Sequence, residues 1–277
     1  MVEAPRIRIL YERIRFTKGK RIVEVSGPSY RKWGVDLTDY VVARWWYAGK
    51  YIYVQLVRDG APTYVVRTHM MMYGRIVIND EVPVSPLARV FMTWVLEDGT
   101  TLRWFRSQIT LLDPTCETDT VRSNYAECCS LEMVRQGIRL MRFDISHPKY
   151  DRGLHLQKLE TDWAVFRNDI LVDLLLDQKY FPGVGNILQQ EALYRCRVLP
   201  TKTVDEAGMP MVTCLVDELS AVIALLYRSY ERKLEALPHE PILQIYRKGM
   251  CPLGHKTVTR YLGYHNRRTT WCPVCQT

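Results

Sequence analysis

The stretch Cys251-Pro-Leu-Gly-His255 is followed, sixteen residues later, by Cys272-Pro-Val-Cys275. Two pairs of ligands at this spacing are typical of a tetrahedral zinc site, because each pair sits on a tight turn and a hairpin between them brings the turns together. The chain after Pro241 is too short to build a hydrophobic core, so metal binding would have to supply the missing folding free energy. Four protein ligands leave no open position for water, which predicts a structural Zn²⁺ and not a catalytic one.

The same C-terminal segment is basic and contains no acid. Residues 241–277 include six Lys and Arg and no Asp or Glu, so they hold +6 of the net charge of +8 and leave +2 for the rest of the chain. A short acid-free basic module suits a polyanion such as nucleic acid, although a merely soluble basic tail would carry the same charges. Arg267 and Arg268, at the predicted hairpin tip, could reach a groove or a phosphate; a solvated turn is the alternative.

The first 110 or so residues are predicted to be mainly β, after a short helix over residues 3–16. Two hairpins are expected. The first has strands at residues 50–56 and 63–67 around a turn at 59–60, and the second has strands at residues 90–96 and 102–105 around a turn at 97–100. The strands are rich in aromatic and β-branched residues, and the turns carry Asp-Gly dipeptides. Closely spaced strands of this kind favour a sandwich or a barrel.

From about residue 117 the pattern becomes helical. Apolar residues recur at helical spacing over residues 131–141, 170–176, 187–194 and 211–235. We therefore predict an α+β protein with three domains: an N-terminal β-sandwich with a leading helix (1–115), a linker and helical domain (116–242), and a zinc-finger β-hairpin (243–277).

Neither a membrane span nor a signal peptide is expected. No apolar run reaches the roughly 18 residues that a span needs, and the N-terminus is too charged to direct secretion. We therefore expect an intracellular, reducing compartment. The remaining cysteines follow no metal spacing and are interpreted as ordinary thiols; they are Cys116, Cys128, Cys129, Cys196 and Cys214.

The turn Gly183-Val-Gly185-Asn186 stands directly before one predicted helix. Two glycines let the backbone turn sharply and leave amide N–H groups free at the positive end of the helix dipole, where an anion is favoured. Asn186 could add a side-chain contact or cap the helix. Most turns of this kind are only turns, so the motif alone is weak evidence for phosphate binding.

The beginning of the chain offers a second kind of chemistry. Val2 is small, so removal of the initiator Met1 would leave a free α-amine next to Glu3. An α-amine has a pKa near 8, well below that of lysine, and is therefore partly neutral and nucleophilic at physiological pH. Such an amine suits Schiff-base chemistry, and the adjacent carboxylate could move protons. Every chain has an N-terminus, so these two residues gain weight only from their context.

That context is the order in which the motifs occur, which resembles the Fpg/Nei family of DNA glycosylases over essentially the whole chain. The similarity is to endonuclease VIII-like members, including those of giant DNA viruses. One vertebrate member also begins with Val where the family usually has Pro. The matching segments are Val2-Glu3, the lysine motif around Lys50, the His-x-x-Met-x-Gly-like segment at residues 68–74, the turn of the helix-two-turn-helix element at residues 183–186, and the zinc finger ending in Cys-Pro-x-Cys-Gln.

The resemblance implies roles for individual residues. Val2 would be the Schiff-base nucleophile and Glu3 its acid/base partner. Lys50 would contact a phosphate near the lesion and assist elimination. Gly185 and Asn186 would hold the DNA backbone at the helix entrance.

Other residues would bind DNA around the lesion. Arg267 would contact a phosphate and support catalysis, with Arg268 beside it, and His69 would lie close to the lesion backbone. Met72 is the candidate for filling the gap left by a flipped base, with Met70 and Met71 as competitors. The alternative for this run of methionines is the core of the sandwich.

By resemblance, then, the chain would excise oxidised bases from damaged DNA, duplex or single-stranded, and cleave the strand by β/δ-elimination. We expect a monomer without membrane contact, in the nucleus or in a viral factory. A catalytically silent zinc-finger protein that binds damaged or abasic DNA is the alternative, and a zinc-ribbon regulator that acts through proteins is another.

Four departures from the family pattern qualify the comparison. Val2 is a primary amine where most members have a secondary one, and His255 replaces a cysteine, which preserves zinc binding. The family's insertion loop has no counterpart near residues 102–107. The link from Tyr230 to Ile242 is too short for the lesion-capping loop of 8-oxoguanine enzymes, which favours oxidised pyrimidines and hydantoins as substrates.

Overall fold

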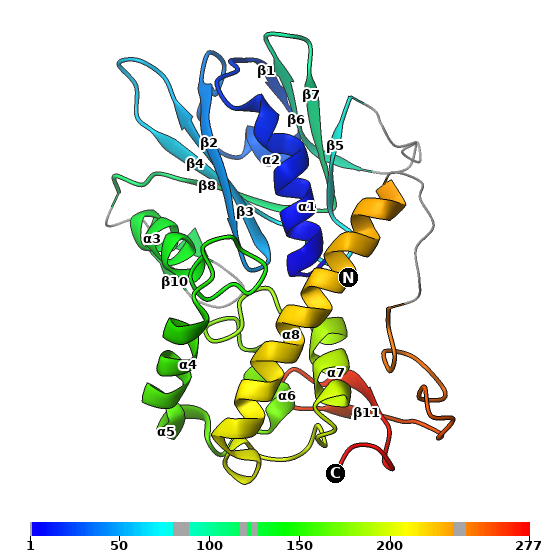
Figure 1. Ribbon diagram of the computed structural model, residues 1–277. Coiled ribbons are helices and arrows are strands. Elements are labelled where there is room, and N and C mark those ends of the chain that lie inside the picture. The colour runs from blue at the N-terminus through cyan, green and yellow to red at the C-terminus, as the bar shows by residue number, and fades with distance from the viewer. Residues whose placement is uncertain (1, 80–88, 117–120, 123–126, 235–241) are drawn as a thin grey trace. The chain divides into compact units, whose positions relative to one another are not determined.

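The computed structural model describes residues 2–79, 89–116, 121–122, 127–234 and 242–277. These residues form two compact units (Figure 1). The β unit comprises Val2 and Leu10–Arg139, and the helical unit comprises Glu3–Ile9 and Leu140–Thr277. The first helix, α1 (Ala4–Ile14), contributes to both.

Two four-stranded antiparallel sheets make up most of the β unit. One has the order β2-β3-β4-β8, with strands Val41–Ala48, Tyr51–Val57, Tyr64–His69 and Gln108–Leu112. The other has the order β1-β6-β7-β5, with strands Ile22–Ser26, Val90–Leu96, Thr101–Phe105 and Arg75–Ile78. Both predicted hairpins are confirmed, as β3–β4 and β6–β7. Short elements complete the unit: a 3-10 turn at Arg15–Thr17, α2 (Pro28–Arg31), β9 (Val121–Arg122), β10 (Glu127–Cys128) and most of α3 (Ser130–Leu140).

Tryptophans join the two sheets face to face. Trp45 of β2 lies 6.3 Å from Trp94 of β6, measured between ring centroids, and Trp94 lies 4.9 Å from Trp104 of β7. The buried indole of Trp104 donates a hydrogen bond to the Thr68 hydroxyl of β4 at 3.2 Å. Buried aromatic side chains of this size contribute strongly to a core, and a buried indole N–H needs such a partner. The predicted β-sandwich with a leading helix is therefore confirmed.

In the described part of the helical unit, five helices pack around a large hydrophobic core. They are α4 (Arg152–Thr161), α5 (Trp163–Phe166), α6 (Leu171–Leu176), α7 (Asn186–Arg195) and α8 (Val204–Leu234). Leu174 of α6, Leu188 of α7 and Leu219 of α8 are all buried in this core. The unit ends in a hairpin of β11 (Val258–Leu262) and β12 (Arg267–Trp271).

Helix α8 begins earlier than predicted and is kinked at Gly208, where φ is 75°. By length and composition alone, residues 204–232 could cross a membrane. Val212, Leu215 and Val222, however, are fully buried in the core of the helical unit. A helix with one apolar face packed in a core passes the same test, so we interpret α8 as a core helix.

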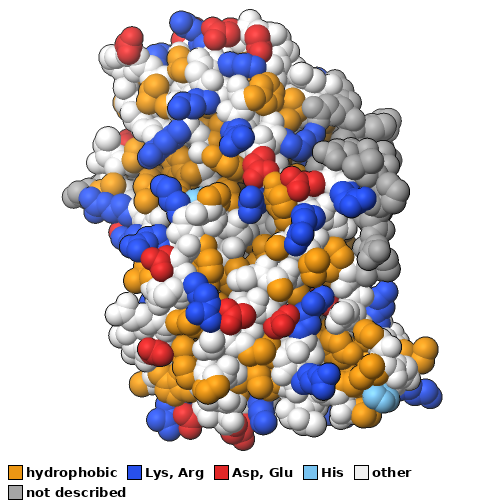
Figure 2. All heavy atoms as spheres, in the orientation of Figure 1, with side chains coloured by type: hydrophobic (Ala, Val, Ile, Leu, Met, Phe, Trp, Pro, Cys, Tyr) orange, Lys and Arg blue, Asp and Glu red, His pale blue; other side chains and the backbone are white. Residues whose placement is uncertain are grey.

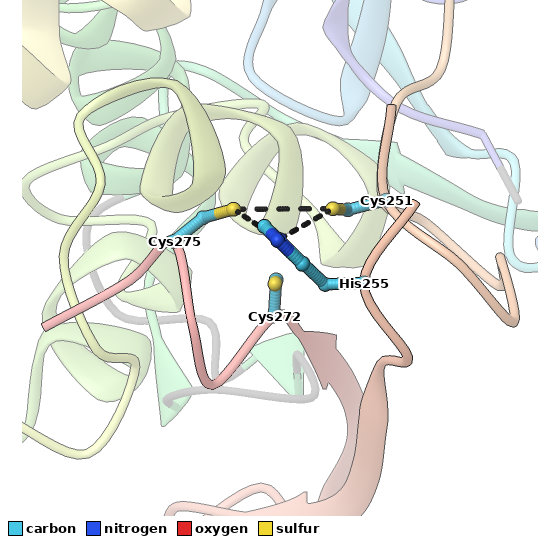
Figure 3. Close-up of side chains that lie close together, drawn as sticks. All are labelled: Cys251, His255, Cys272 and Cys275. Atoms are coloured by element: carbon cyan, nitrogen blue, oxygen red, sulfur yellow. Dashed lines mark hydrogen bonds between the residues drawn. The ribbon is translucent and has the colours of Figure 1, made fainter. Parts of the chain in front are cut away.

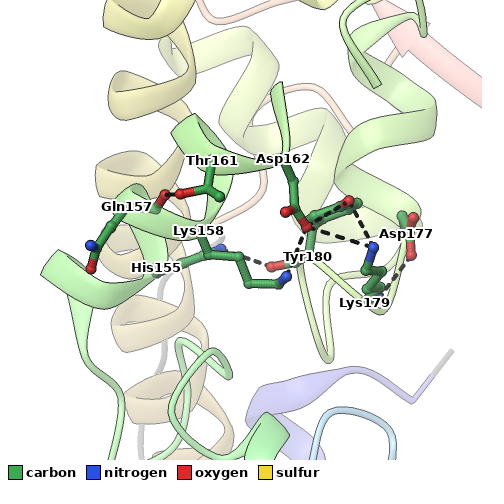
Figure 4. Close-up of polar contacts among 8 residues, drawn as sticks. All are labelled: His155, Gln157, Lys158, Thr161, Asp162, Asp177, Lys179 and Tyr180. Carbon is green, nitrogen blue, oxygen red and sulfur yellow. Dashed lines mark hydrogen bonds and ion pairs between the residues drawn. The ribbon is translucent and has the colours of Figure 1, made fainter. Parts of the chain in front are cut away.

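The loop that leads into α7 is fixed by a polar network (Figure 4). The backbone carbonyl of Tyr180 accepts a hydrogen bond from His155 Nε2 at 2.7 Å, and the hydroxyl of Tyr180 donates one to the Asp162 carboxylate at 3.0 Å. Lys158 and Lys179 pair with the same Asp162 carboxylate at 2.9 and 3.6 Å. Burial lowers the pKa of His155 to about 4, which leaves the ring neutral near pH 7.

One expectation about the cysteines is wrong. Cys196, after α7, and Cys214, in α8, form a disulfide with their Cα atoms 6.1 Å apart. The spacing of 18 residues carries no sequence signal, and the pairing arises because α7 packs against α8. Cys116 and Cys129 form no disulfide with a described residue, as expected, while the side chain of Cys128 lies outside the described part of the chain.

Candidate active site and metal centre

The carboxylate of Glu3 is bound at the N-terminus of α7. Its Oε1 accepts a hydrogen bond from the backbone N–H of Ile187 at 2.9 Å, and its Oε2 accepts one from Leu188 at 3.1 Å. The next residue, Ala4, donates its N–H to the Gly183 carbonyl at 3.0 Å. Glu3 is only 4 % exposed. Two amides and the positive end of the helix dipole thus hold the second residue of the predicted catalytic pair in place.

Gly185 is required by this contact. A Cβ at Gly185 would overlap the Glu3 carboxylate, so no larger residue fits while Glu3 stays docked. The N-terminus of α7 does bind an anion, but this anion, held by Ile187 and Leu188, is a side chain of the protein itself and not the phosphate that the glycine turn was expected to bind. Among the described residues, the backbone N–H groups of Gly185 and Asn186 have no acceptor and remain available to another anion.

The same helix holds the arginine hairpin. Asn186 Nδ2 and Gln190 Nε2 donate to the Arg268 carbonyl at 2.9 and 3.1 Å, and Gln190 Oε1 accepts the Thr270 N–H at 2.8 Å. Asn186 therefore does not cap α7; it is the first helical residue, and Gly185 is the cap. Gln190 was not foreseen, because a glutamine inside a helix carries no signal of its partner.

Helix α6 holds the tip of the hairpin. Asp173 accepts the Tyr264 N–H at 2.8 Å, and Asp169 accepts the Tyr264 hydroxyl at 3.1 Å. Gly263, with φ at 72°, lets the backbone pass so close to Asp173 that any side chain there would overlap the carboxylate. Burial raises the pKa of Asp173, which is 7 % exposed.

Between these anchors, the two arginines point to solvent. Arg267 and Arg268 are exposed at the start of β12, and neither forms an ion pair with any described residue. Lys and Arg side chains are spread over the surface drawn in Figure 2 and are not gathered in one patch. Two exposed guanidinium groups on a hairpin with an anchored backbone are therefore open to an anionic partner.

In the β unit, Lys50 follows Gly49 in the turn between β2 and β3. His69 ends β4, and its ring lies against that of Tyr51, with centroids 4.9 Å apart and the planes tilted by 52°. Its Nδ1 accepts the Met71 N–H at 3.2 Å. Burial, with the charges of Lys50 and Arg67, lowers the pKa of His69 to about 4. Its ring is thus neutral near pH 7 and can accept or donate a hydrogen bond beside Lys50.

The three methionines differ in environment. Met70 is 1 % exposed and belongs to the core of the β unit, whereas Met71 and Met72 are 44 % and 51 % exposed. Met71 adopts the left-handed conformation, with φ at 48°, and is tied to His69. The next residue, Tyr73, is 67 % exposed and was not singled out from the sequence. Met72 is thus the free apolar side chain of the run.

Four side chains form a cluster that could hold a metal ion (Figure 3). One ligand atom from each of Cys251, His255, Cys272 and Cys275 lies within 4.8 Å of the other three. Three sulfurs and an imidazole nitrogen at this separation fit one tetrahedral metal ion. Cys272 is further fixed by its N–H, which donates to Gln276 Oε1 at 2.8 Å.

Glu191 of α7 anchors the segment that leads to Cys251 and His255 and was not singled out from the sequence. Its buried carboxylate accepts three backbone N–H groups, from Gln244, Ile245 and Tyr246, at 2.8, 3.0 and 2.9 Å. A carboxylate that accepts three amide bonds is a strong anchor. Successive turns of α7 thus hold Glu3, the arginine hairpin and the segment that leads to the metal ligands.

Comparison with known proteins gives the family. The chain is 51 % identical over 276 residues to an endonuclease 8-like protein of Acanthamoeba polyphaga mimivirus, and the match covers 100 % of both chains. The chain belongs to the endonuclease 8-like family. A crystal structure of a viral DNA glycosylase matches with a TM-score of 0.94 at 50 % identity over 100 % of both chains. No protein-family model matches.

More distant relatives extend the likeness of this endonuclease 8-like protein. Endonuclease 8-like 2 of Bos taurus is 38 % identical over 136 residues, which cover 48 % of this chain and 38 % of the bovine protein. A formamidopyrimidine DNA glycosylase of Lactococcus lactis, bound to DNA with an AP site, matches with a TM-score of 0.71 over 99 % of both chains. At 17 % identity, that likeness concerns the fold. The predicted family and the α+β architecture are confirmed.

Proposed function

We propose that this endonuclease 8-like protein is a base-excision DNA glycosylase and AP lyase that acts through a Schiff base at Val2. The observation that carries the proposal is the docking of Glu3 on α7, with hydrogen bonds of 2.9 and 3.1 Å. A carboxylate that only faced solvent would need neither two backbone N–H donors nor a glycine at position 185 that leaves space for it. Because a peptide bond joins Val2 to Glu3, the docking restrains the α-amine that removal of Met1 would create.

The chemistry needs a neutral amine and a proton carrier. The α-nitrogen of Val2 attacks C1′ of the damaged nucleotide and the C1′–N bond to the base breaks, with a proton going to the base. The sugar ring then opens to an imine, and Glu3 moves a proton to the ring oxygen. The imine makes the C2′ proton acidic, so its loss expels the 3′-phosphate, and a second elimination expels the 5′-phosphate. Water then releases the amine.

In duplex DNA, access to C1′ requires that the damaged nucleotide leave the DNA double helix, which costs a few kcal/mol. Phosphate contacts offset that cost by gripping a bent backbone. We assign such contacts to the free N–H groups of Gly185 and Asn186 and to Arg267; Arg268 also binds the DNA, on the other face of the β11–β12 hairpin. In the β unit, Lys50 contacts phosphate and assists elimination, and His69 lies near the lesion backbone. Met72 fills the gap left by the base.

The metal is proposed to be Zn²⁺. Three thiolates and one imidazole form a ligand set that zinc favours, and four protein ligands leave no position for water. The ion therefore has a structural role: it joins the two ends of the module that contains the arginine hairpin. Hydrogen bonds to the ligand residues, such as that of Gln276 with Cys272, keep the ligands oriented.

Oxidised pyrimidines and hydantoins are the proposed substrates. The proposal rests on the short link from Tyr230 to Ile242, most of which lies outside the described residues. The domain limits 1–115, 116–242 and 243–277, the monomeric state and the compartment, a nucleus or a viral factory, stay predictions.

Borohydride trapping tests the proposal. Borohydride reduces the imine to a stable amine, so wild-type protein should become covalently linked to an oligonucleotide that carries an oxidised pyrimidine. A variant that retains Met1 before Val2 should bind the same DNA but form no adduct. If the wild-type protein binds abasic DNA tightly and is never trapped, the silent DNA-binding protein is the correct interpretation.

A further inference from the structure

The β11–β12 hairpin has two different faces. Tyr261 pairs directly with Arg268, and Leu262 pairs with Arg267. Side chains alternate along a strand, and directly opposed residues share a face. Tyr261 and Arg268 therefore lie together on one face, and Arg267 lies on the other with Arg260. A single phosphate contact through Arg267 uses only the second of these faces.

The side chains of Tyr261 and Arg268 are not used in any polar contact with the described residues. Tyr261 is 66 % exposed and Arg268 is exposed, and within the described part of the chain neither side chain takes part in an ion pair or a ring contact. Residues 241–277 contain no Asp or Glu, so the module itself offers the arginine no acidic partner. The pair combines a flat aromatic ring with a planar cation, both open to solvent.

This face is held rigidly. Asn186 and Gln190 fix the backbone carbonyl of Arg268 at 2.9 and 3.1 Å, and Asp173 fixes the turn through the Tyr264 N–H at 2.8 Å. The Thr259 and Thr270 hydroxyls meet at 3.0 Å on the same face. A solvated hairpin needs no such anchors, whereas a binding surface gains affinity when it is ordered before the ligand arrives.

We infer that Tyr261 and Arg268 form a stacking platform for an unpaired DNA base next to the lesion. Aromatic rings and guanidinium planes stack on base faces, and those faces are open only where a strand is single or locally unpaired. In a closed duplex each base face is covered by its neighbours. The inference rests on the proposed function and deepens it: it assigns the hairpin face opposite Arg267 to an unpaired base that flanks the lesion.

Binding to an uncleavable abasic analogue tests the platform without any chemistry. The full metal-loaded chain is titrated with a tetrahydrofuran-containing oligonucleotide as a single strand, inside a bubble and in a closed duplex. Tyr261→Ala should weaken binding to the single strand and the bubble about tenfold, the loss of one stacked base. Binding to the duplex should not change. Tyr261→Phe is the matched control, because it keeps the ring, and it should bind all three like wild type.

Arg268→Lys provides a second, independent variant. It keeps the charge and loses the flat guanidinium, so it should lose affinity for the single strand while the salt dependence of duplex binding stays the same. Equal weakening on all three substrates, or no effect of Tyr261→Ala on the single strand, would overturn the inference. Unfolding midpoints and metal content of each variant show that the module is folded.

The two proposals fail in different ways. If trapping by borohydride fails while Tyr261→Ala still weakens single-strand binding selectively, the Schiff base is wrong and the platform stands. If trapping succeeds and the variant binds like wild type, the platform is wrong and the Schiff base stands.

Discussion

The carboxylate of Glu3 accepts a hydrogen bond from the backbone N–H of Leu188 at 3.1 Å, across 185 positions of sequence. A second hydrogen bond, from the Ile187 N–H at 2.9 Å, makes the contact bidentate. The beginning of the chain is thereby attached to the first turn of α7, the helix that also holds the arginine hairpin and the segment leading to the metal ligands.

Gly185→Ala should break this attachment. The added Cβ would overlap the Glu3 carboxylate, and overpacking of this kind costs about 1–3 kcal/mol of unfolding free energy. We also expect loss of borohydride trapping, because the α-amine is no longer restrained. Urea unfolding and trapping measure the two effects.

Gly153→Ala is the matched control for that substitution. Gly153 lies in α4, where an added Cβ meets only ordinary van der Waals contact, and alanine favours a helix. Its stability should be equal to or above that of wild type, with trapping intact. A Gly185→Ala protein that is stable and fully trapped would show that the docking of Glu3 has no role.

Asp173 should show a difference between two substitutions. Burial raises the pKa of this carboxyl, so the folded protein binds a proton more tightly than the unfolded chain, and ionisation costs stability as pH rises through the raised pKa. Asp173→Asn keeps an acceptor for the Tyr264 N–H without the charge and should be at least as stable as wild type near neutral pH. Asp173→Ala leaves that N–H unpaired and should lose about 1–3 kcal/mol. The measurement is the unfolding free energy of both variants at several pH values. Equal stability of the two would mean that Asp173 does not hold the tip of the β11–β12 hairpin.

Acid should destabilise the helical unit through His155. Burial lowers the pKa of His155 from 6.5 to about 4, so as the pH falls the ring is protonated in the unfolded chain before it is protonated in the folded protein. The stability that depends on the neutral ring is therefore complete above pH 6.5 and is lost as the pH falls toward 4. The difference corresponds to about 3 kcal/mol. His155→Gln can still donate to the Tyr180 carbonyl, cannot titrate, and should flatten the pH dependence of unfolding in this range. A variant with the full wild-type pH dependence would assign the effect elsewhere, for example to His69 or His147, whose pKa values are also lowered to about 4.

Metal removal should weaken DNA binding by loosening the hairpin. A chelator should lower the unfolding midpoint and the affinity for abasic DNA together, because the ion joins the ends of the module that holds Arg267. His255→Cys preserves four ligands and should retain one metal ion per chain, whereas Cys272→Ser should lose it. Metal analysis and thermal unfolding measure this; a chelated protein with unchanged midpoint and affinity would show that the helical anchors alone hold the hairpin.

Local patterns predicted most of the elements. Strands β3, β4, β6 and β7 follow from alternating aromatic and β-branched residues closed by Asp-Gly turns, and the metal centre follows from ligand spacing. The start of α8 was placed too late, at Met211, because Gly208 and Pro210 look like a stop signal, yet the chain kinks there and continues.

What stayed hidden depends on contacts between distant segments. Gln190, Glu191 and Asp173 look like ordinary helical residues, and their partners lie 78, 53 and 91 positions away. The disulfide between Cys196 and Cys214 is hidden for the same reason. The anion at this helix entrance was expected from outside the protein, because sequence alone could not show that Glu3 occupies the amides of Ile187 and Leu188.

The most direct test of the account is to locate the covalent bond. Protein trapped with borohydride on lesion-bearing DNA is digested with nuclease and protease, and the modified peptide is sequenced by mass spectrometry. We predict that the reduced sugar is attached to the α-nitrogen of Val2, on a peptide that lacks Met1. An adduct on Lys50 or on another lysine, or trapping that persists with Met1 retained, would contradict it.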